Sequence, residues 1–173
     1  MALVVLLRGV NVGGSRTFKP TQLVAQLKHL DAVNIGAAGT LVIRKTVAIA
    51  ALRAELEKRL PFVTEIMICQ GRDILRLMST EHYAKFPPRA DETRFVSVLA
   101  KTPPKTLKVP MTLPPKGKWL MQILAREDRF VLGVYRRHMK VIGYLGTMDK
   151  LFGVPATTRN WNTITAIAKV LAG

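Results

Sequence analysis

Two short polar clusters near the ends of the chain carry the residues best suited to chemistry. The first is Leu7-Arg8-Gly9-Val10-Asn11-Val12-Gly13-Gly14, and the second is Thr157-Thr158-Arg159-Asn160-Trp161-Asn162-Thr163. Each cluster combines an arginine, an asparagine and backbone N–H groups at a point where an apolar segment stops or starts. Guanidinium groups and free backbone N–H groups are donors that hold anions. The clusters therefore favour a site for an anionic ligand.

The glycines of the first cluster follow an apolar segment, residues 2–7, as the glycines of phosphate-binding loops follow a strand. Their spacing matches neither G-x-G-x-x-G nor G-x-x-x-x-G-K-[ST]. Two interpretations stay open. The segment is either a tight turn in which Asn11 hydrogen-bonds the loop backbone, or a place where Arg8 meets a carboxylate, a carbonyl group or a bound anion.

For the second cluster we expect Thr157 or Thr158 to cap a final helix over residues 158–171. This assignment places Arg159 in the first helical turn. A cation there opposes the helix dipole, whereas a bound anion or a nearby carboxylate reverses the sign of the interaction. Arg159 therefore needs a partner.

Two partners of Arg159 are consistent with the sequence. In the first interpretation Arg159 and Asn160 bind a phosphate or carboxylate, together with Arg8 and Asn11 if the two clusters meet in space. In the second, Arg159 packs against Trp161 or pairs with an acid of the first half and joins the two halves. The first interpretation predicts these ligand-binding residues: Arg8, Asn11, Gly13, Gly14, Arg159, Asn160 and Asn162.

No familiar catalytic motif is present in the sequence. His29, His82 and His138 lack metal-site spacing, and no two carboxylates recur at an interval that would place them together. Cys69 is the only cysteine, which excludes an intrachain disulfide and a cysteine-based zinc site. We therefore predict no metal and no cofactor. An enzyme that acts on an anionic metabolite stays open as a further alternative, with its catalytic residues unknown.

The charge of the chain suggests a second class of function. There are 27 Lys and Arg against 11 Asp and Glu, a formal net charge of +16. Such a charge attracts polyanions over long distances, although it also fits an ordinary solvated surface. The alternative function is therefore nucleic-acid binding through the basic second half. Its predicted contacts are Lys105, Lys116, Lys118, Arg136 and Arg137.

Length and composition indicate a folded protein. With 173 residues, of which 49% are hydrophobic, the chain can build one good core or two small ones. Residues 2–7 form an apolar segment too short for a signal peptide or a membrane span. Together with the single cysteine, this predicts a cytoplasmic protein with no membrane partner. The oligomeric state stays open.

The periodicity of the first half predicts alternating strands and helices. We expect strands at residues 2–7, 32–35, 41–44 and 65–70, and helices at residues 20–30 and 46–60, the second capped by Thr46. The first strand is apolar throughout, so we expect it to be central and buried on both faces. The resulting βαββαβ order is that of a ferredoxin-like unit.

The second half is richer in strands. After a connecting helix over residues 72–78, the segment Phe86-Pro87-Pro88-Arg89 marks a boundary, which divides the chain into residues 1–86 and 87–173. Strands are expected at residues 93–100, 119–125, 130–135 and 139–144. Five prolines in residues 101–118 argue against a long regular helix there, and a short helix at residues 105–108 stays open.

The motifs LLRGVNVGG and GVPATTRNWNT resemble those of the bacterial family known as domain of unknown function 1697, over essentially the whole chain. The resemblance implies an α+β fold of two ferredoxin-like subdomains (βαββαβ or a variant) with antiparallel sheets. It implies no activity, because none is established for the family. Two segments depart from the family: Ala38-Gly39-Thr40 replaces a Ser-Gly-Asn turn, and the helix expected near Lys150 is shortened before Val154-Pro155.

Overall fold

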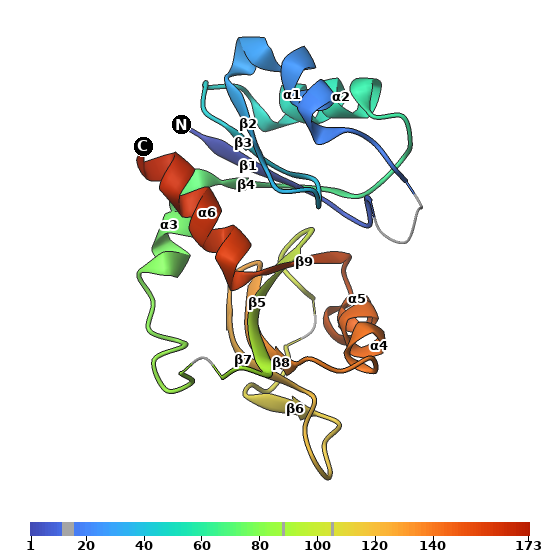
Figure 1. Cartoon of the computed structure of the whole chain (residues 1–173), viewed down its shortest axis with the longest axis vertical. Coiled ribbons are helices and arrows are strands. Elements are labelled where there is room, and N and C mark those ends of the chain that lie inside the picture. The colour runs from blue at the N-terminus through green and yellow to red at the C-terminus, as the bar shows by residue number, and fades with distance from the viewer. Residues whose placement is uncertain (12–15, 88, 105) are drawn as a thin grey trace. The chain divides into compact units, whose positions relative to one another are not determined.

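The computed structural model describes residues 1–11, 16–87, 89–104 and 106–173 (Figure 1). The chain divides into two compact units. Unit 1 consists of Met1–Ser79 and Asn162–Gly173, and unit 2 consists of Thr80–Trp161. This division differs from the expected 1–86 and 87–173 because the chain returns to unit 1 at its C-terminal end. No helix in the described part of the chain is long and apolar enough to cross a membrane.

Unit 1 contains a four-stranded sheet with the order β2-β3-β1-β4, in which every pair of neighbours is antiparallel. Its first six major elements are β1 (Leu3–Leu7), α1 (Pro20–Gln26), β2 (Ala32–Ile35), β3 (Thr40–Ile43), α2 (Ile49–Arg59) and β4 (Ile66–Gln70). They follow the βαββαβ order expected from the periodicity. α1 is shorter than expected, and a 3₁₀ turn (Lys28–Leu30) continues its path.

Thr46 does not cap α2, contrary to the expectation from sequence. The helix begins at Ile49, with Ala48 at the N-cap position. The Thr46 hydroxyl oxygen instead accepts a hydrogen bond of 2.9 Å from the amino group of Met1. Thr46 therefore contacts the start of β1, so the chain enters α2 without a side-chain cap.

The central strand β1 is buried along its whole length. Leu3, Val5 and Leu7 pack in the core that includes α1 and α2, and Val4 and Leu6 on the opposite face have no exposed surface. Because neither face of β1 meets water, its apolar run does not alternate with polar residues. The expectation of a central strand buried on both faces is confirmed.

Two further helices complete unit 1, α3 (Gly71–Met78) and α6 (Trp161–Ala172), which lie side by side in Figure 1. Gly71, at the start of α3, explains how closely they approach. A Cβ atom at Gly71 would lie 2.7 Å from the Leu171 Cδ2 and 3.2 Å from the Ala2 carbonyl oxygen. The last turn of α6 therefore occupies space that any larger residue would need.

Unit 2 contains a five-stranded antiparallel sheet with the order β6-β7-β8-β5-β9. Its elements are β5 (Glu92–Leu99), β6 (Met111–Leu113), β7 (Met121–Glu127), β8 (Phe130–Arg136), α4 (Val141–Gly146), α5 (Met148–Phe152) and β9 (Ala156–Asn160). Four strands precede its helices, so unit 2 departs from the βαββαβ order. The chain is therefore a mixed α and β protein with two antiparallel sheets.

Two sequence assignments in this half are wrong. Residues 139–144 are not a strand, because α4 begins at Val141. Val141 is buried, and Tyr144 and Leu145 pack on the same core, which is helical spacing. The last helix begins at Trp161, because residues 156–160 form β9.

The pairing of β9 with β5 explains the second error. It runs from Phe95 opposite Asn160 to Leu99 opposite Ala156. An edge of β5 would otherwise carry unpaired backbone groups, and the β-branched Thr157 and Thr158 suit a strand. Neither threonine therefore caps a helix.

Tyr83 anchors the segment that leads into the unit 2 sheet. Its hydroxyl lies 2.5 Å from the Phe95 carbonyl oxygen and 3.0 Å from the Gly133 carbonyl oxygen, and its ring packs edge-to-face on Trp161. Burial raises the pKa of the Tyr83 hydroxyl well above its ordinary value. The phenol therefore stays protonated and can donate to the sheet.

The close packing around Gly133 gives a first prediction. A Cβ atom there would lie 2.4 Å from both the Gln122 carbonyl oxygen and the Phe95 Cζ. We expect Gly133→Ala to lower the free energy of unfolding by about 1–3 kcal/mol through overpacking. The measurement is chemical denaturation. Gly143→Ala is the matched control, because its Cβ meets nothing within 4 Å, and equal losses in both variants would contradict the prediction.

Tyr83→Phe gives a second prediction. At neutral pH the free energy of unfolding of the variant should be about 1 kcal/mol lower than that of wild type, because the hydroxyl contacts disappear while the ring stays. Above about pH 10 the tyrosine ionises in the unfolded chain but not in the folded one, so the unfolded state binds fewer protons and wild-type stability falls. The difference in free energy of unfolding between wild type and Tyr83→Phe should therefore become smaller as pH rises through this range.

Denaturation curves at several pH values from about 7 to 11 would measure this difference in free energy of unfolding. The range includes the ordinary tyrosine pKa of about 10. Tyr144→Phe serves as the control, because the Tyr144 hydroxyl has no hydrogen-bond partner within the described ranges. A gap that stays constant with pH would show that the Tyr83 phenol does not behave as a buried, protonated group.

Candidate functional site

Arg8 leaves the end of β1 at a point where the backbone is held on both sides. Its N–H donates to the Glu65 carbonyl oxygen at 3.0 Å, and its own carbonyl oxygen accepts a hydrogen bond from the Thr64 hydroxyl. The Arg8 side chain is half-buried. These bonds therefore fix the backbone position of Arg8 at the end of β1, where the sequence also placed it.

Asn11 holds the loop that follows β1. Its side-chain Nδ2 donates to the Ala37 carbonyl oxygen at 2.9 Å, and its Oδ1 accepts from the Phe18 N–H at 2.9 Å. Both ends of the amide thus bind backbone groups, and Asn11 itself has a positive φ of 54°. The other predicted residues of this loop, Gly13 and Gly14, lie outside the described residues.

Arg159 occupies β9, opposite Val96 of β5, and not the first turn of a helix. The argument from the helix dipole therefore does not apply to it. Its residue surface is only 7% exposed, and its Nη1 donates to the Thr157 hydroxyl at 2.8 Å and the Thr158 carbonyl oxygen at 3.0 Å. Burial lowers the pKa of the Arg159 guanidinium from its ordinary value to about 10.

The two other predicted ligand-binding residues of the second cluster, Asn160 and Asn162, are exposed. Asn160 ends β9, and Asn162 lies in the first turn of α6. Arg159 and Asn160 belong to unit 2, whereas Asn162 belongs to unit 1 with the first cluster. A common site formed by both clusters thus stays an expectation from sequence.

Unit 1 has a groove of about 460 Å³ that we call the arginine groove. Three arginines line it: Arg8 after β1, Arg16 in the following loop and Arg53 on α2. Thr64 also lines it, in the segment before β4. Sequence reasoning identified Arg8 but not Arg16 or Arg53, because no local spacing relates a loop residue to a helix residue 37 positions later.

The side-chain hydrogen bonds of Arg16 and Arg53 go to neutral groups. Arg16 Nη1 donates to the Thr64 hydroxyl at 3.2 Å, and Arg53 Nη1 donates to the Ile66 carbonyl oxygen at 2.7 Å. Within the part of the chain that the structure describes, neither arginine forms an ion pair. Glu57 and Glu65 also line the groove and are exposed. The lining of the groove thus contains both guanidinium donors and carboxylate acceptors.

A second groove, of about 280 Å³, lies in unit 2 and is called here the tryptophan groove. Its described polar and aromatic lining consists of Lys85, Phe86, Arg89, Glu92, Trp119, Gln122 and Arg136. Arg136 is thus the one residue of the predicted nucleic-acid set that lines it. Lys116, Lys118 and Arg137 are exposed, and Lys105 lies outside the described residues.

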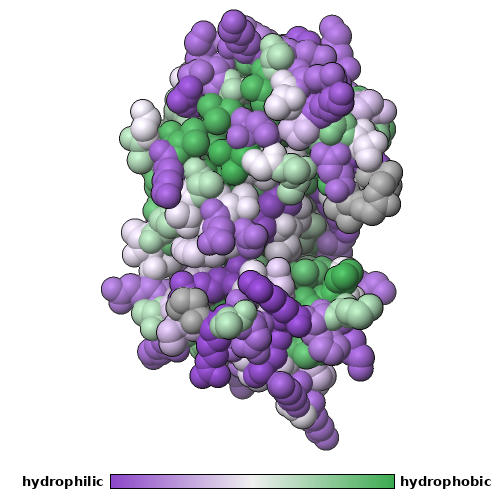
Figure 2. Space-filling view, in the orientation of Figure 1, coloured by the Kyte–Doolittle hydropathy of each residue, from purple (hydrophilic) through white to green (hydrophobic). Residues whose placement is uncertain are grey.

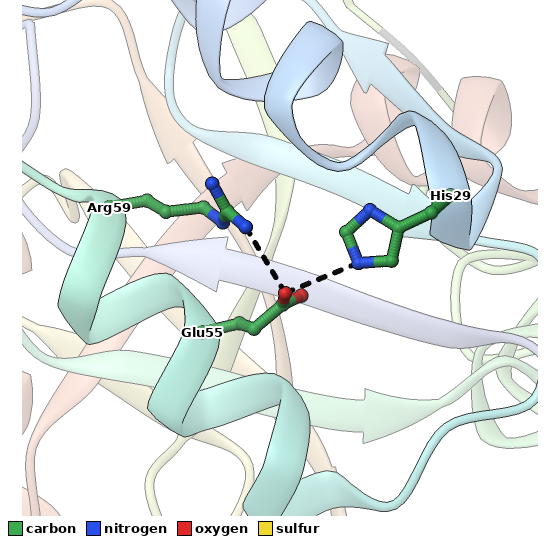
Figure 3. Close-up of polar contacts among 3 residues, drawn as sticks. All are labelled: His29, Glu55 and Arg59. Atoms are coloured by element: carbon green, nitrogen blue, oxygen red, sulfur yellow. Dashed lines mark hydrogen bonds and ion pairs between the residues drawn. The ribbon is translucent and has the colours of Figure 1, made fainter.

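The histidines make local polar contacts. His29 Nε2 lies 3.2 Å from Glu55 Oε1, which also accepts from Arg59 Nη2 at 3.3 Å, so that Glu55 bridges the turn after α1 to the end of α2 (Figure 3). His82 Nε2 lies 2.9 Å from Glu127 Oε1. These side chains are roughly a third or more exposed, and such pairs contribute about 0–1 kcal/mol each.

Metal and thiol chemistry find little support in the described residues. Among them, no group of three or more His, Cys, Asp or Glu side chains is arranged to hold a metal ion. Cys69 is buried in β4, with its Sγ 3.8 Å from the Val4 carbonyl oxygen. Buried structural cysteines are usually inert.

Comparison with known proteins identifies the family. The family model described as "Protein of unknown function (DUF1697)" matches residues 1–115. The matched region contains Arg8, Arg16, Arg53 and Thr64 of the arginine groove, and it ends before Arg159. No curated protein matches the sequence.

A solved structure shares the fold. It is that of a conserved bacterial protein, SP0830, from Streptococcus pneumoniae, which is 16% identical, with a TM-score of 0.59 and coverage of 98% of both chains. At this identity the likeness concerns the fold alone. The family expected from the two motifs is confirmed by the family model, and the chain belongs to the DUF1697 family of proteins of unknown function.

Proposed function

We propose that this protein binds a small ligand with a phosphate or carboxylate group in the arginine groove. The observation that carries the proposal is the convergence of Arg8, Arg16 and Arg53 on one groove. Two of these guanidinium groups hydrogen-bond only to the neutral acceptors given above, so their charges are not compensated by those bonds. Like charges gathered in one groove repel, and a bound anion turns that repulsion into attraction.

The chemistry of the groove suits this class of ligand. Guanidinium groups present a planar set of donors that fits phosphate and carboxylate oxygens. The volume of about 460 Å³ lies within the range of about 300–1,000 Å³ typical of small-molecule sites. Glu57 and Glu65 on the wall can accept hydrogen bonds from hydroxyl or amino groups of the same ligand. We therefore favour an anion that also carries such donors over a simple polyanion.

The proposed site keeps one part of the sequence hypothesis and changes the rest. Arg8 stays, Arg16, Arg53 and Thr64 join it, and Asn11 serves to hold the loop. The second cluster is not required, since the arginine groove lies within unit 1 and Arg159 lies in unit 2. No general base is assigned, so the proposal is for binding and not for a reaction.

We also propose that unit 1 is a ferredoxin-like unit. The element order β1-α1-β2-β3-α2-β4 and the antiparallel strand order β2-β3-β1-β4 support this assignment. In such a unit β1 is central, so its end and the loop beyond it face the segments that precede β4. This arrangement fits a groove built from Arg8, Thr64 and α2.

The anion proposal predicts ligand-dependent stability. A ligand at 100 times its dissociation constant stabilises by about 2.7 kcal/mol, which corresponds to a rise of very roughly 5–10 °C in the melting temperature of a chain of this size. We expect such a rise for wild type with at least one of phosphate, pyrophosphate, citrate or phosphoserine at constant ionic strength. The double variant Arg16→Gln and Arg53→Gln should lose it.

The matched control is the double variant Lys28→Gln and Lys58→Gln, which removes the same charge from exposed positions of unit 1 outside the groove. It should keep the rise of the wild type. If none of the four anions raises the wild-type melting temperature, or if the control loses the effect as fully as the arginine variant, the arginine groove is not an anion site.

A further inference from the structure

Trp119 and Arg136 stack on one another at one end of the unit 2 sheet. The Arg136 Cζ lies 4.2 Å from the centroid of the Trp119 ring, well within the distance of about 6 Å for a cation–π contact. Both side chains are partly accessible, and that of Arg136 is 20% exposed. The pair therefore presents an aromatic ring with a guanidinium charge over it at the surface of the tryptophan groove.

The sheet holds this stack in place. Arg136 is the last residue of β8, lies opposite Glu92 of β5, and donates its N–H to the Leu120 carbonyl oxygen at 2.8 Å. Leu120 follows Trp119 directly, so this bond fixes the two stacked residues relative to one another. Phe86, which also lines the groove, is held as well, because its carbonyl oxygen accepts a hydrogen bond of 2.9 Å from Arg94 Nη2.

Positive charge surrounds the stack. Lys85 and Arg89 line the groove with Arg136, and Glu92 is the only acid among the described residues of its lining. Asp91 Oδ2 lies 3.7 Å from Arg136 Nη1, a long ion pair. The exposed Lys116 and Lys118 precede Trp119 in the chain. Figure 2 shows one face of the molecule coloured by hydropathy, and hydrophilic residues cover much of it.

We infer that the tryptophan groove binds single-stranded nucleic acid. An unpaired base stacks on the Arg136–Trp119 pair, and the phosphates on either side contact Lys85 and Arg89. Unpaired bases stack on aromatic rings and on guanidinium planes, whereas the bases of a duplex have no free face to offer. Single-stranded nucleic acid therefore matches both features of the groove: a base contacts the Arg136–Trp119 pair, and the phosphates contact the positive charges.

Size favours a strand over a free nucleotide. At about 280 Å³ the groove lies at the lower end of the range of about 300–1,000 Å³ for sites that enclose a small molecule. Two further cations lie outside this lining but next to its residues in the sequence: Lys118 precedes Trp119, and Arg137 follows Arg136. A ligand that places one base in the groove and further phosphates outside it meets both conditions.

Fluorescence anisotropy with labelled single-stranded DNA and RNA of about 12 nucleotides tests the inference on the full chain, a length within the site sizes of single-strand binding proteins. We expect Trp119→Leu to weaken binding about tenfold, the loss of one stacked base, and Trp119→Phe to keep most of the affinity. Arg136→Lys keeps the charge but not the plane, so it should weaken binding by a similar factor.

Lys150→Ala is the control for charge, because Lys150 is an exposed cation of unit 2 outside the groove. It should change the affinity less than twofold, roughly the loss expected from one distant charge. Melting temperatures of all variants show whether each one is folded. Three results would overturn the inference: equal losses in Trp119→Leu and Lys150→Ala, a duplex that binds as tightly as the single strand, or mononucleotides that compete at equal nucleotide concentration.

Discussion

The placement of β1 in the middle of the unit 1 sheet is the constraint on which the rest of that unit depends. Antiparallel neighbours satisfy its backbone on both sides, and its five side chains are at most 3% exposed. Because the strand cannot shift by one residue without moving buried side chains to other positions, its register is fixed. That register determines where the chain leaves the sheet: the Leu7 N–H donates to the Gly39 carbonyl oxygen at 2.8 Å, and Arg8 bonds to residues 64 and 65. The arginine groove is therefore built on the most strongly fixed part of the unit.

The protein places its arginines in three distinct environments. Arg159 is buried in the unit 2 sheet among threonine and backbone oxygens, where loss of hydration lowers its pKa. Arg136 covers an aromatic ring and keeps part of its surface in solvent. The arginines of the arginine groove line an open groove, and two of them, Arg16 and Arg53, donate hydrogen bonds to neutral oxygens. Only the last two environments leave a guanidinium accessible to a ligand, and this is why the proposed sites lie there and not at the more conspicuous Arg159.

The errors of the sequence interpretation concern segments whose structure depends on distant partners. Thr157-Thr158 before an apolar helical stripe is a good helix start by local criteria, yet β5 recruits these residues as a fifth strand. Residues 139–144 have strand-like composition, yet only Val141, Tyr144 and Leu145 of this region meet the core, and that spacing requires a helix. In unit 1, by contrast, the strands and helices follow each other closely in sequence, and the predicted βαββαβ order matches the structure to within a few residues at each boundary.

The sequence by itself determined the elements of unit 1, the buried central strand, the exit of Arg8 from that strand and the membership of the family. These features follow from apolar periodicity and from short motifs, which are properties of neighbouring residues. Only the tertiary structure decided that Arg16 and Arg53 join Arg8, that Trp119 stacks on Arg136, and that Arg159 is buried in a strand. Each of these depends on the path of the chain over tens of residues, because side chains from separate elements meet only when the sheets pair and the loops close. No local sequence pattern encodes such long-range contacts, so the two grooves, and with them the proposed binding sites, became visible only in the folded chain.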